Sequence, residues 1–348
     1  MNILIDLLHP MEFHLFNLII EKLKLNGHNV ILTIRKVETL IDLLNHSGYE
    51  YHIVSKKGKG LIGLFIELIS RICKISRIAR KSKIELFLSG SVLSVAVVGL
   101  LKNKPSILFT EHEDEGLKSG LVFKLASKIY TPKFYERDFG KKMKKFNTLY
   151  QLNYLHPKYF TPNKGIAESL LNFDLENEKY FILRFCDWSA THDIKEKGFS
   201  KEYKDEIINF LTQEGKVYIL DEGKTPEYDK YKLDIPKNEI FNVLAYSSLV
   251  ISETTSISIE SALLGVPVVR CTSLVDTRKG GAAIFDQLHK DGLVFSYSDE
   301  KIAFQKIEKI IVEKKPNLYW INKKNDFIKQ FDDDTISLFY ESIISYRK

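Results

Sequence analysis

The chain has 348 residues, of which 44% are hydrophobic and 28% are charged, and it carries a net charge of +6. This length exceeds what one hydrophobic core usually supports, and the composition excludes a disordered chain, so we expect two globular domains. No apolar run reaches the roughly 18 residues that a membrane-spanning helix needs. The opening residues lack the basic region of a signal peptide, and three widely spaced cysteines favour a reducing compartment. We therefore expect a cytoplasmic protein.

The first half of the chain alternates short apolar runs with stretches of helical periodicity. Such alternation predicts strands joined by helices, and hence a doubly wound parallel sheet. The predicted strands are 2–8, 29–35, 49–55, 84–90, 105–111 and 128–132, and the main predicted helices are 13–25, 61–80, 92–101 and 116–127.

The pattern loosens around 147–177, where three helix-breaking residues occur, and restarts at 179 with further predicted strands at 179–185, 216–222, 248–253 and 267–271. We therefore expect two Rossmann-like domains facing across a cleft, with ligands beyond the carboxyl ends of the strands. The predicted parts are an N-terminal domain (1–160), a linker (161–178), a C-terminal domain (179–325) and a C-terminal helix packed on the N-terminal domain (326–348).

The most informative segment is 248–268, SLVISETTSISIESALLGVPV. A strand ends at Glu253, and the small hydroxyl residues Thr254, Thr255 and Ser256 stand where a helix begins. The amide groups and dipole of that helix end suit a diphosphate. Glu260, further along the same helix, could accept two hydrogen bonds from a ribose diol. The alternative is an ordinary capped helix with an exposed glutamate.

This order of strand, small loop, helix, glutamate and Gly-x-Pro (Gly265 to Pro267) resembles the nucleotide-binding segment of the GT-B superfamily. That group includes nucleotide-sugar glycosyltransferases and non-hydrolysing UDP-N-acetylglucosamine 2-epimerases. HP-x₃-H (9–14), SGS (89–91) and LRFCDWSATHD (183–193) extend the resemblance to an uncharacterised branch known as a domain of unknown function. The resemblance implies a GT-B fold, a nucleotide-sugar as the donor substrate, and neither a metal nor another cofactor. It assigns Thr254, Thr255 and Ser256 to the diphosphate and Glu260 to the ribose.

Glycosyl transfer needs a base for the acceptor hydroxyl, and three residues are candidates. His14 is predicted to open a helix on the acceptor side, where the positive helix end lowers its pKa and keeps it neutral. His9 stands just before it, and either histidine could instead cap or pack against its own loop. Glu111 follows the fifth strand, at the start of an acidic run that is otherwise an ordinary solvated loop.

Other residues at the same strand ends are candidates for holding the substrates. Arg184 could neutralise the departing diphosphate, and Glu222 could contact the nucleotide. The candidates for binding the sugar or the acceptor are His9, Ser89, Ser91, His112, Trp188, Ser189 and His192.

Residues 56–83 mix apolar positions at helical spacing with many cations. One interpretation is a patch that binds an anionic membrane surface on the inner face of the membrane. The other is a core helix whose lysines and arginines face water. No nucleic-acid motif accompanies the basic surface, so we do not expect a nucleic-acid partner, and the sequence does not predict the oligomeric state.

We interpret the chain as a glycosyltransferase that acts on a glycan or lipid-linked acceptor in surface polysaccharide synthesis. A nucleotide-sugar 2-epimerase is the first alternative. The epimerases resembled here carry an acidic, Arg-containing signature after the Gly-x-Pro strand, which RCTSLVDTRKGG (270–281) does not reproduce. A non-catalytic nucleotide- or glycan-binding protein is the second alternative, and it predicts binding without turnover.

Overall fold

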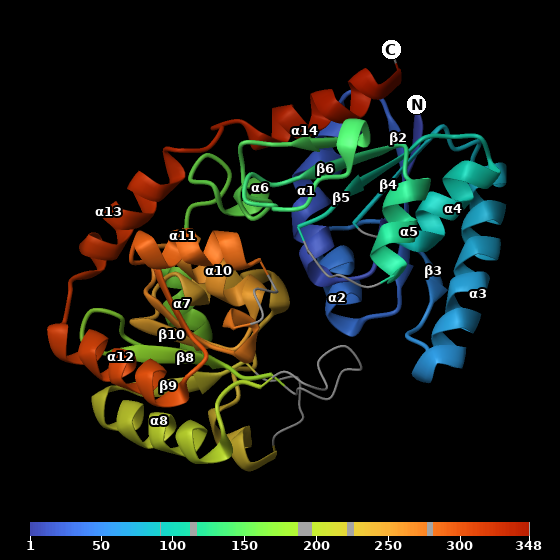
Figure 1. The fold of residues 1–348 in the computed structure, drawn as a ribbon. Helices are drawn as coiled ribbons and strands as arrows, with labels where there is room; N and C mark the ends of the chain where they lie inside the picture. The colour runs from blue at the N-terminus through green and yellow to red at the C-terminus, as the bar shows by residue number, and fades with distance from the viewer. Residues whose placement is uncertain (91, 112–116, 187–196, 221–225, 277–280, 348) are drawn as a thin grey trace. The chain divides into compact units, whose positions relative to one another are not determined.

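The computed structural model describes residues 1–90, 92–111, 117–186, 197–220, 226–276 and 281–347. The chain forms two compact units, which we call unit 1 (1–154 and 331–348) and unit 2 (155–330). Each unit contains one parallel sheet flanked by helices (Figure 1). The predicted class of two doubly wound parallel-sheet domains is confirmed.

Unit 1 has a sheet of seven parallel strands in the order β3-β2-β1-β4-β5-β6-β7. Its strands are β1 (Asn2–Leu7), β2 (Asn29–Arg35), β3 (Tyr51–Ser55), β4 (Leu86–Ser89), β5 (Ser106–Phe109), β6 (Lys128–Thr131) and β7 (Met143–Lys145). Its helices are α1 (Pro10–Leu25), α2 (Glu38–His46), α3 (Gly60–Lys81), α4 (Leu93–Leu101), α5 (Leu117–Leu125) and α14 (Thr335–Ile344), and α6 (Leu152–Leu155) leads into unit 2.

The two faces of this sheet are covered by different helices. On one face, Leu4 and Phe87 pack with Ile75 of α3 and Val95 of α4 in a single apolar cluster. On the other face, Phe109 of β5 contacts α1 and stacks on a phenylalanine of α14 with ring centroids 5.0 Å apart. The last helix therefore completes the core of unit 1, next to α1 (Figure 1).

Unit 2 has five parallel strands in the order β12-β11-β10-β8-β9. The strands are β8 (Tyr180–Arg184), β9 (Lys216–Ile219), β10 (Leu249–Ser252), β11 (Val268–Cys271) and β12 (Val294–Tyr297). The helices are α7 (Lys164–Leu171), α8 (Lys201–Glu214), α9 (Ile240–Leu244), α10 (Thr255–Leu263), α11 (Ala282–Lys290), α12 (Glu300–Glu313) and α13 (Asn317–Ile328).

The alternation of side chains along the strands of unit 2 separates an apolar face from a partly polar one. Leu183, Ile251 and Val269 pack against α8 and α12 in one large cluster. Because successive strand residues point to opposite faces, the residues that follow them, Arg184 and Ser252 among them, face the other way.

The segment predicted as a linker, 161–178, contains the helix α7. Asn163 caps this helix by accepting a hydrogen bond from the amide of Ile166, and the side chains of Ala167 and Leu171 are buried. This helix was not predicted, because it has only two turns and because nearby prolines and Gly165 are residues typical of loops.

Candidate functional site

The order of the strands reverses at one point in each sheet, between β1 and β4 in unit 1 and between β8 and β10 in unit 2. Parallel sheets bind ligands beyond the carboxyl ends of the strands at such points. His9 and Ser89 lie at this place in unit 1, and Arg184 and Thr254 lie there in unit 2. Several residues predicted from the sequence therefore lie at a switch point within their own unit.

The turn between β1 and α1 is closed by reciprocal hydrogen bonds. Nδ1 of His9 accepts a hydrogen bond from the amide of Met11 at 3.3 Å, so His9 is the N-cap of α1. The carboxylate of Glu12 in return accepts from the amides of Leu8 at 2.5 Å and His9 at 3.3 Å. With Pro10 in the first position, α1 begins three residues before the predicted start. His9 thus has the capping role that the sequence offered as its alternative.

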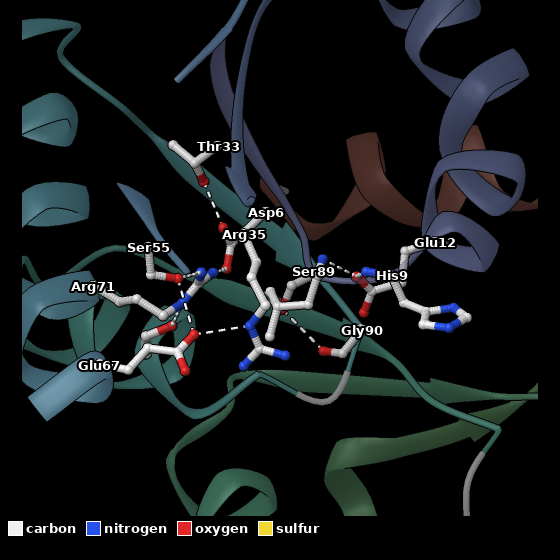
Figure 2. A network of polar contacts seen from close by, with 12 residues as sticks. Asp6, His9, Glu12, Thr33, Arg35, Ser55, Glu67, Arg71, Ser89 and Gly90 are labelled. Carbon is white, nitrogen blue, oxygen red and sulfur yellow. Dashed lines mark hydrogen bonds and ion pairs between the residues drawn. The ribbon is translucent and has the colours of Figure 1, made fainter. Parts of the chain in front are cut away.

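Glu12 is buried at this turn, close to the backbone of Gly90 (Figure 2). A Cβ at position 90 would lie 2.1 Å from Oε1 of Glu12, so only glycine fits there. Burial raises the pKa of Glu12 to about 7, and the nearby carboxylate of Asp6 adds to the rise. The two backbone hydrogen bonds favour the charged form and limit the shift.

His14 lies in the second turn of α1, half-buried between two aromatic rings. Its ring is 5.4 Å from that of Phe13 and 5.2 Å from that of Tyr154, measured between centroids. Burial lowers the pKa of His14 to about 4, and the charge of His9 lowers it further. His14 is therefore neutral at pH 7, as expected from the sequence. The main cause of its low pKa is burial, however, and not the helix end.

The second candidate base, Glu111, lies beyond the end of β5. Both of its carboxylate oxygens accept hydrogen bonds from Nε2 of Gln151, at 3.3 and 3.1 Å. Gln151 stands three residues before Tyr154, the residue that packs on His14. One short segment of unit 1 therefore contacts two of the three candidate bases, His14 and Glu111.

Of the remaining candidates for binding the sugar or the acceptor, the structure describes only Ser89. Ser89 is fully buried and donates its hydroxyl to the carbonyl of Gly90 at 2.9 Å, so this hydroxyl faces the protein interior. Among the residues that the structure describes, no cluster of three His, Cys, Asp or Glu side chains suits a metal ion. The candidates that lie outside the described residues are Ser91, His112, Trp188, Ser189, His192 and Glu222.

In unit 2, helix α10 begins without a side-chain cap from its N-cap residue. Thr254 has an extended backbone, and within the described chain its side chain makes no capping hydrogen bond. Its hydroxyl instead lies 3.0 Å from the hydroxyl of Ser252, which also accepts from the amide of Thr254 at 3.0 Å. Thr255 and Ser256 follow in the first turn, half-buried. An anion can approach such a helix end, where the dipole and the amides both favour negative charge.

Glu260 lies in the second turn of α10 and is only 5% exposed. The alternative from the sequence, an ordinary helix with an exposed glutamate, is therefore wrong. Most glutamates remain at the surface, and a buried one is held by partners. Its position on the helix that carries Thr254 agrees with the predicted grouping of these residues.

Two arginines lie on the partly polar face of this sheet. Nη1 of Arg184 donates to the carbonyl of Leu220 at 2.9 Å, which anchors the guanidinium beside the end of β9. Arg270 on β11 pairs in register with Ser252 and is 1% exposed. Its guanidinium lies 3.9 Å from the ring centroid of Phe285.

Two nitrogens of the Arg270 guanidinium, Nε and Nη2, lack hydrogen-bond partners among the described residues. Burial lowers its pKa to about 10, so the group remains a cation at neutral pH. Arg270 was not predicted as a site residue, because within the apolar run PVVRC (267–271) no local pattern marks it as functional.

Glu253, the residue after β10, organises the neighbouring loop. Its carboxylate accepts from the amide of Cys186 at 2.5 Å and from that of Phe199 at 2.8 Å, and Nζ of Lys204 lies 3.4 Å away. A Cβ at Gly198 would lie 2.3 Å from this carboxylate. Glu253 therefore fixes both flanks of the segment that contains the sugar-binding candidates of unit 2. From the sequence, Glu253 was predicted only to end a strand.

Unit 1 also contains a buried polar network that was not predicted from the sequence. The carboxylate of Asp6 accepts hydrogen bonds from the hydroxyl of Thr33 at 2.7 Å and from Nη2 of Arg71 (Figure 2). Nη1 of Arg71 donates to Ser55 at 2.7 Å. The only signal in the sequence is an aspartate in the middle of the apolar run NILIDLL.

A second ion pair adjoins this network. Glu67 accepts from Nε of Arg35 at 2.8 Å, from the hydroxyl of Ser55 at 2.9 Å and from the amide of Gly58 at 3.0 Å (Figure 2). These hydrogen bonds lower the pKa of Glu67, although its burial acts in the opposite direction. The network joins β1, β2 and β3 to α3 and has the character of structural support.

Comparison with known proteins places the chain in a family. A family model described as "Protein of unknown function (DUF354)" matches residues 1–280. An uncharacterized protein from Methanocaldococcus jannaschii is 22% identical over 284 residues, which are 78% of this chain and 82% of that protein. The prediction of an uncharacterised branch is confirmed.

Solved structures with the same fold include UDP-GlcNAc 2-epimerases and glycosyltransferases. The UDP-GlcNAc 2-epimerase from Neisseria meningitidis, bound to UDP-GlcNAc, has a TM-score of 0.66 at 14% identity, covering 99% of this chain and 100% of its own. MurG from Acinetobacter baumannii has a TM-score of 0.59 at 11% identity over 99% and 100%. The spinosyn rhamnosyltransferase SpnG, complexed with spinosyn aglycone, has 0.62 at 14% over 98% and 100%. The GT-B fold is confirmed.

The raised pKa of Glu12 leads to a test of the turn between β1 and α1. A carboxyl group with a raised pKa in the folded state stabilises the fold most at low pH. One pH unit corresponds to about 1.4 kcal/mol, so the contribution of Glu12 should fall by about 3 kcal/mol as the pH rises from 4.5 to about 7. Glu12→Gln lacks this titration. Its free energy of unfolding should therefore rise relative to that of the wild type by the same amount between pH 4.5 and about 7. Urea unfolding at several pH values measures the difference, and parallel curves would contradict the assignment.

Proposed function

The chain belongs to the family described as "Protein of unknown function (DUF354)", and we propose that it is a GT-B glycosyltransferase. It moves a sugar from a nucleotide-sugar to a glycan or lipid-linked acceptor in the synthesis of surface polysaccharide. The observation that carries this proposal is the start of α10, where within the described chain the side chain of Thr254 makes no capping hydrogen bond. On the neighbouring strand, two nitrogens of the buried Arg270 have no hydrogen-bond partner among the same residues. The fold supports it, because UDP-GlcNAc 2-epimerases and glycosyltransferases share this architecture.

Unit 2 holds the donor in this proposal. The diphosphate lies at the first turn of α10, against Thr254, Thr255 and Ser256, and the ribose hydroxyls bind Glu260. Arg184, anchored at the end of β9, stabilises the negative charge on the leaving nucleotide. Arg270 acts at longer range, because a buried cation is weakly screened by solvent and raises the potential at the neighbouring strand ends.

In the proposed sugar transfer, negative charge develops on the leaving nucleotide and the acceptor hydroxyl loses its proton. The acceptor oxygen attacks the anomeric carbon while the bond from that carbon to the diphosphate oxygen breaks. The nucleotide leaves with the bonding electron pair, and the acceptor proton passes to a base. We assign the base to His14, because its imidazole is neutral at pH 7 and packed in a fixed position against Tyr154.

An epimerase of the same fold is the alternative that the experiments must separate. The sequence after β11 lacks the signature of those epimerases, which favours transfer. Incubation with a UDP-sugar in the absence of acceptor distinguishes the two, since the C2 epimer accumulates only with an epimerase. Neither product would appear with a protein that only binds its ligand.

We expect Glu260→Gln to weaken the binding of the nucleotide about tenfold or more, the scale of hydrogen bonds to a charged group. The substitution preserves the volume of a side chain that is 5% exposed. Calorimetric titration with UDP-, GDP-, CMP- and TDP-sugars first identifies the nucleotide and then measures the loss. Glu227→Gln, at an exposed site of unit 2, is the control. Equal affinity of the folded Glu260→Gln variant and the wild type would refute the donor site.

Arg270→Met separates electrostatic from structural roles. Replacing a buried charge by an apolar side chain of similar size is often neutral or stabilising, so the melting temperature should not fall. Affinity for the nucleoside diphosphate should drop about tenfold, while affinity for the nucleoside alone should stay unchanged. The control Lys306→Met removes another cation stacked on a ring, 3.6 Å from the centroid of Phe295, and should change neither affinity. Equal loss for both ligands would show a structural arginine.

The identity of the base is tested by rate and by pH. His14→Ala should abolish transfer and leave the affinity for the nucleotide within a few-fold of the wild type. Because the pKa of His14 is about 4, the rate of the parent should not fall between pH 8 and pH 5 through loss of this base. If His14→Ala retains most of its rate and Glu111→Ala loses it, Glu111 is the base.

A further inference from the structure

The outer face of α3 is apolar along its N-terminal half. Five large side chains repeat at helical spacing and are exposed, and we call them the apolar stripe: Leu61 (80% exposed), Ile62 (78%), Phe65 (64%), Ile66 (62%) and Ile69 (45%). Single exposed apolar residues are ordinary, but a contiguous row marks a surface that another body covers. In Figure 1, α3 lies at the outside of unit 1 beside α4.

The exposure of this stripe follows from the polar residues on the inner face. Glu67 and Arg71 occupy inward positions of α3, one turn apart, and form ion pairs with Arg35 and Asp6. Turning the helix to bury the apolar stripe would move both charged groups away from their partners. Separating a buried ion pair is strongly unfavourable, so the fold keeps the apolar side chains outward.

Cations flank the apolar stripe on both sides in the sequence. Between residues 56 and 84 the only acidic residue is Glu67, which is bonded to Arg35. The exposed flanking cations are Lys56, Lys57, Lys59, Lys74, Arg77, Arg80, Lys81 and Lys83. The basic surface continues into a cavity of about 240 Å³ lined by Arg80, Lys83, Lys102 and Lys104. An apolar stripe bordered by cations is complementary to a lipid surface, in which apolar acyl chains lie beneath anionic headgroups.

We propose that α3 is the docking surface of this protein for a bilayer that contains anionic lipids. The helix lies in the plane of the interface, with the apolar stripe among the acyl chains and the flanking cations at the phosphates. Among the described helices, none has the length and apolar character needed to cross a bilayer, so α3 rests on the membrane. This inference does not depend on the proposed sugar transfer.

Charge also argues against a second copy of the chain on this surface. Two stripes packed against each other would bring the flanking cations of both copies together, with Glu67 of each already paired inside its own fold. Such like charges repel, whereas an anionic bilayer neutralises them. A bilayer is therefore the occupant that fits both the apolar and the charged residues.

The test is sedimentation of the full chain with vesicles of phosphatidylglycerol and phosphatidylcholine, or of phosphatidylcholine alone. The wild type should bind the anionic vesicles at low salt and lose most of that binding at high salt, because screening shortens the reach of surface charges. Leu61→Ser/Phe65→Ser/Ile69→Ser should lose binding in both conditions. Lys74→Ser/Arg77→Ser/Lys81→Ser should bind about 100-fold more weakly, since each cation near the surface contributes separately.

Matched variants in unit 2 serve as controls. Val312→Ser/Leu318→Ser removes exposed apolar side chains, and Lys237→Ser/Lys301→Ser/Lys315→Ser removes three exposed cations. Both should bind vesicles as the wild type does, and all variants should keep its circular dichroism and melting temperature. Three results would overturn the proposal: a wild type that ignores anionic vesicles at low salt, a stripe variant that binds normally, or a dimer in solution that this variant dissociates.

Discussion

Asp6 is completely buried near the carboxyl end of β1, and its carboxylate is held by Thr33 and Arg71. A buried carboxylate is tolerated only when its lone pairs are satisfied, so Arg71 must face the sheet. That requirement fixes the rotation of α3 about its own axis and brings Glu67 inward as well. The apolar side chains of the helix are then left outside. One buried charge in the first strand thus connects the core of unit 1 to the character of its surface.

Unit 2 treats its buried charges differently. Glu253 is satisfied by two amides and accompanied by Lys204, and it fixes the loop ends around it. Arg270 has an aromatic ring as its neighbour, while two of its nitrogens have no hydrogen-bond partner within the described chain. The first arrangement stabilises the fold, whereas the second costs stability unless negative charge approaches. A bound anion would supply such charge, which is the electrostatic reason for proposing a nucleotide diphosphate as the ligand of unit 2.

The sequence predicted most of the strands because buried parallel strands are short apolar runs, and β2 has the predicted bounds of 29–35. It missed β7, which is three residues of MKK, and β12, which has only one fully buried residue. The helix start of α10 was predicted because its signals are local. The partnership of Asp6 with Arg71 was not, because 65 residues separate them and no local pattern records a contact through space. The low pKa of His14 was expected for its helix position but arises from tertiary burial.

In the first two turns of α1, the pKa values of a carboxyl group and an imidazole stand in the reverse of their usual order. Burial raises the pKa of Glu12 to about 7 and lowers that of His14 to about 4. Between these values both groups are uncharged, although a carboxyl and an imidazole in water would both be ionised at pH 5.5. In the proposed transfer, the uncharged Glu12 does not compete with a neutral hydroxyl acceptor, and the lone pair of the neutral His14 takes the acceptor proton. Unit 2 has the opposite character, with buried positive charge at the ends of its strands. In the proposed function, unit 1 supplies the neutral environment for the acceptor and unit 2 the positive environment for the anionic leaving group.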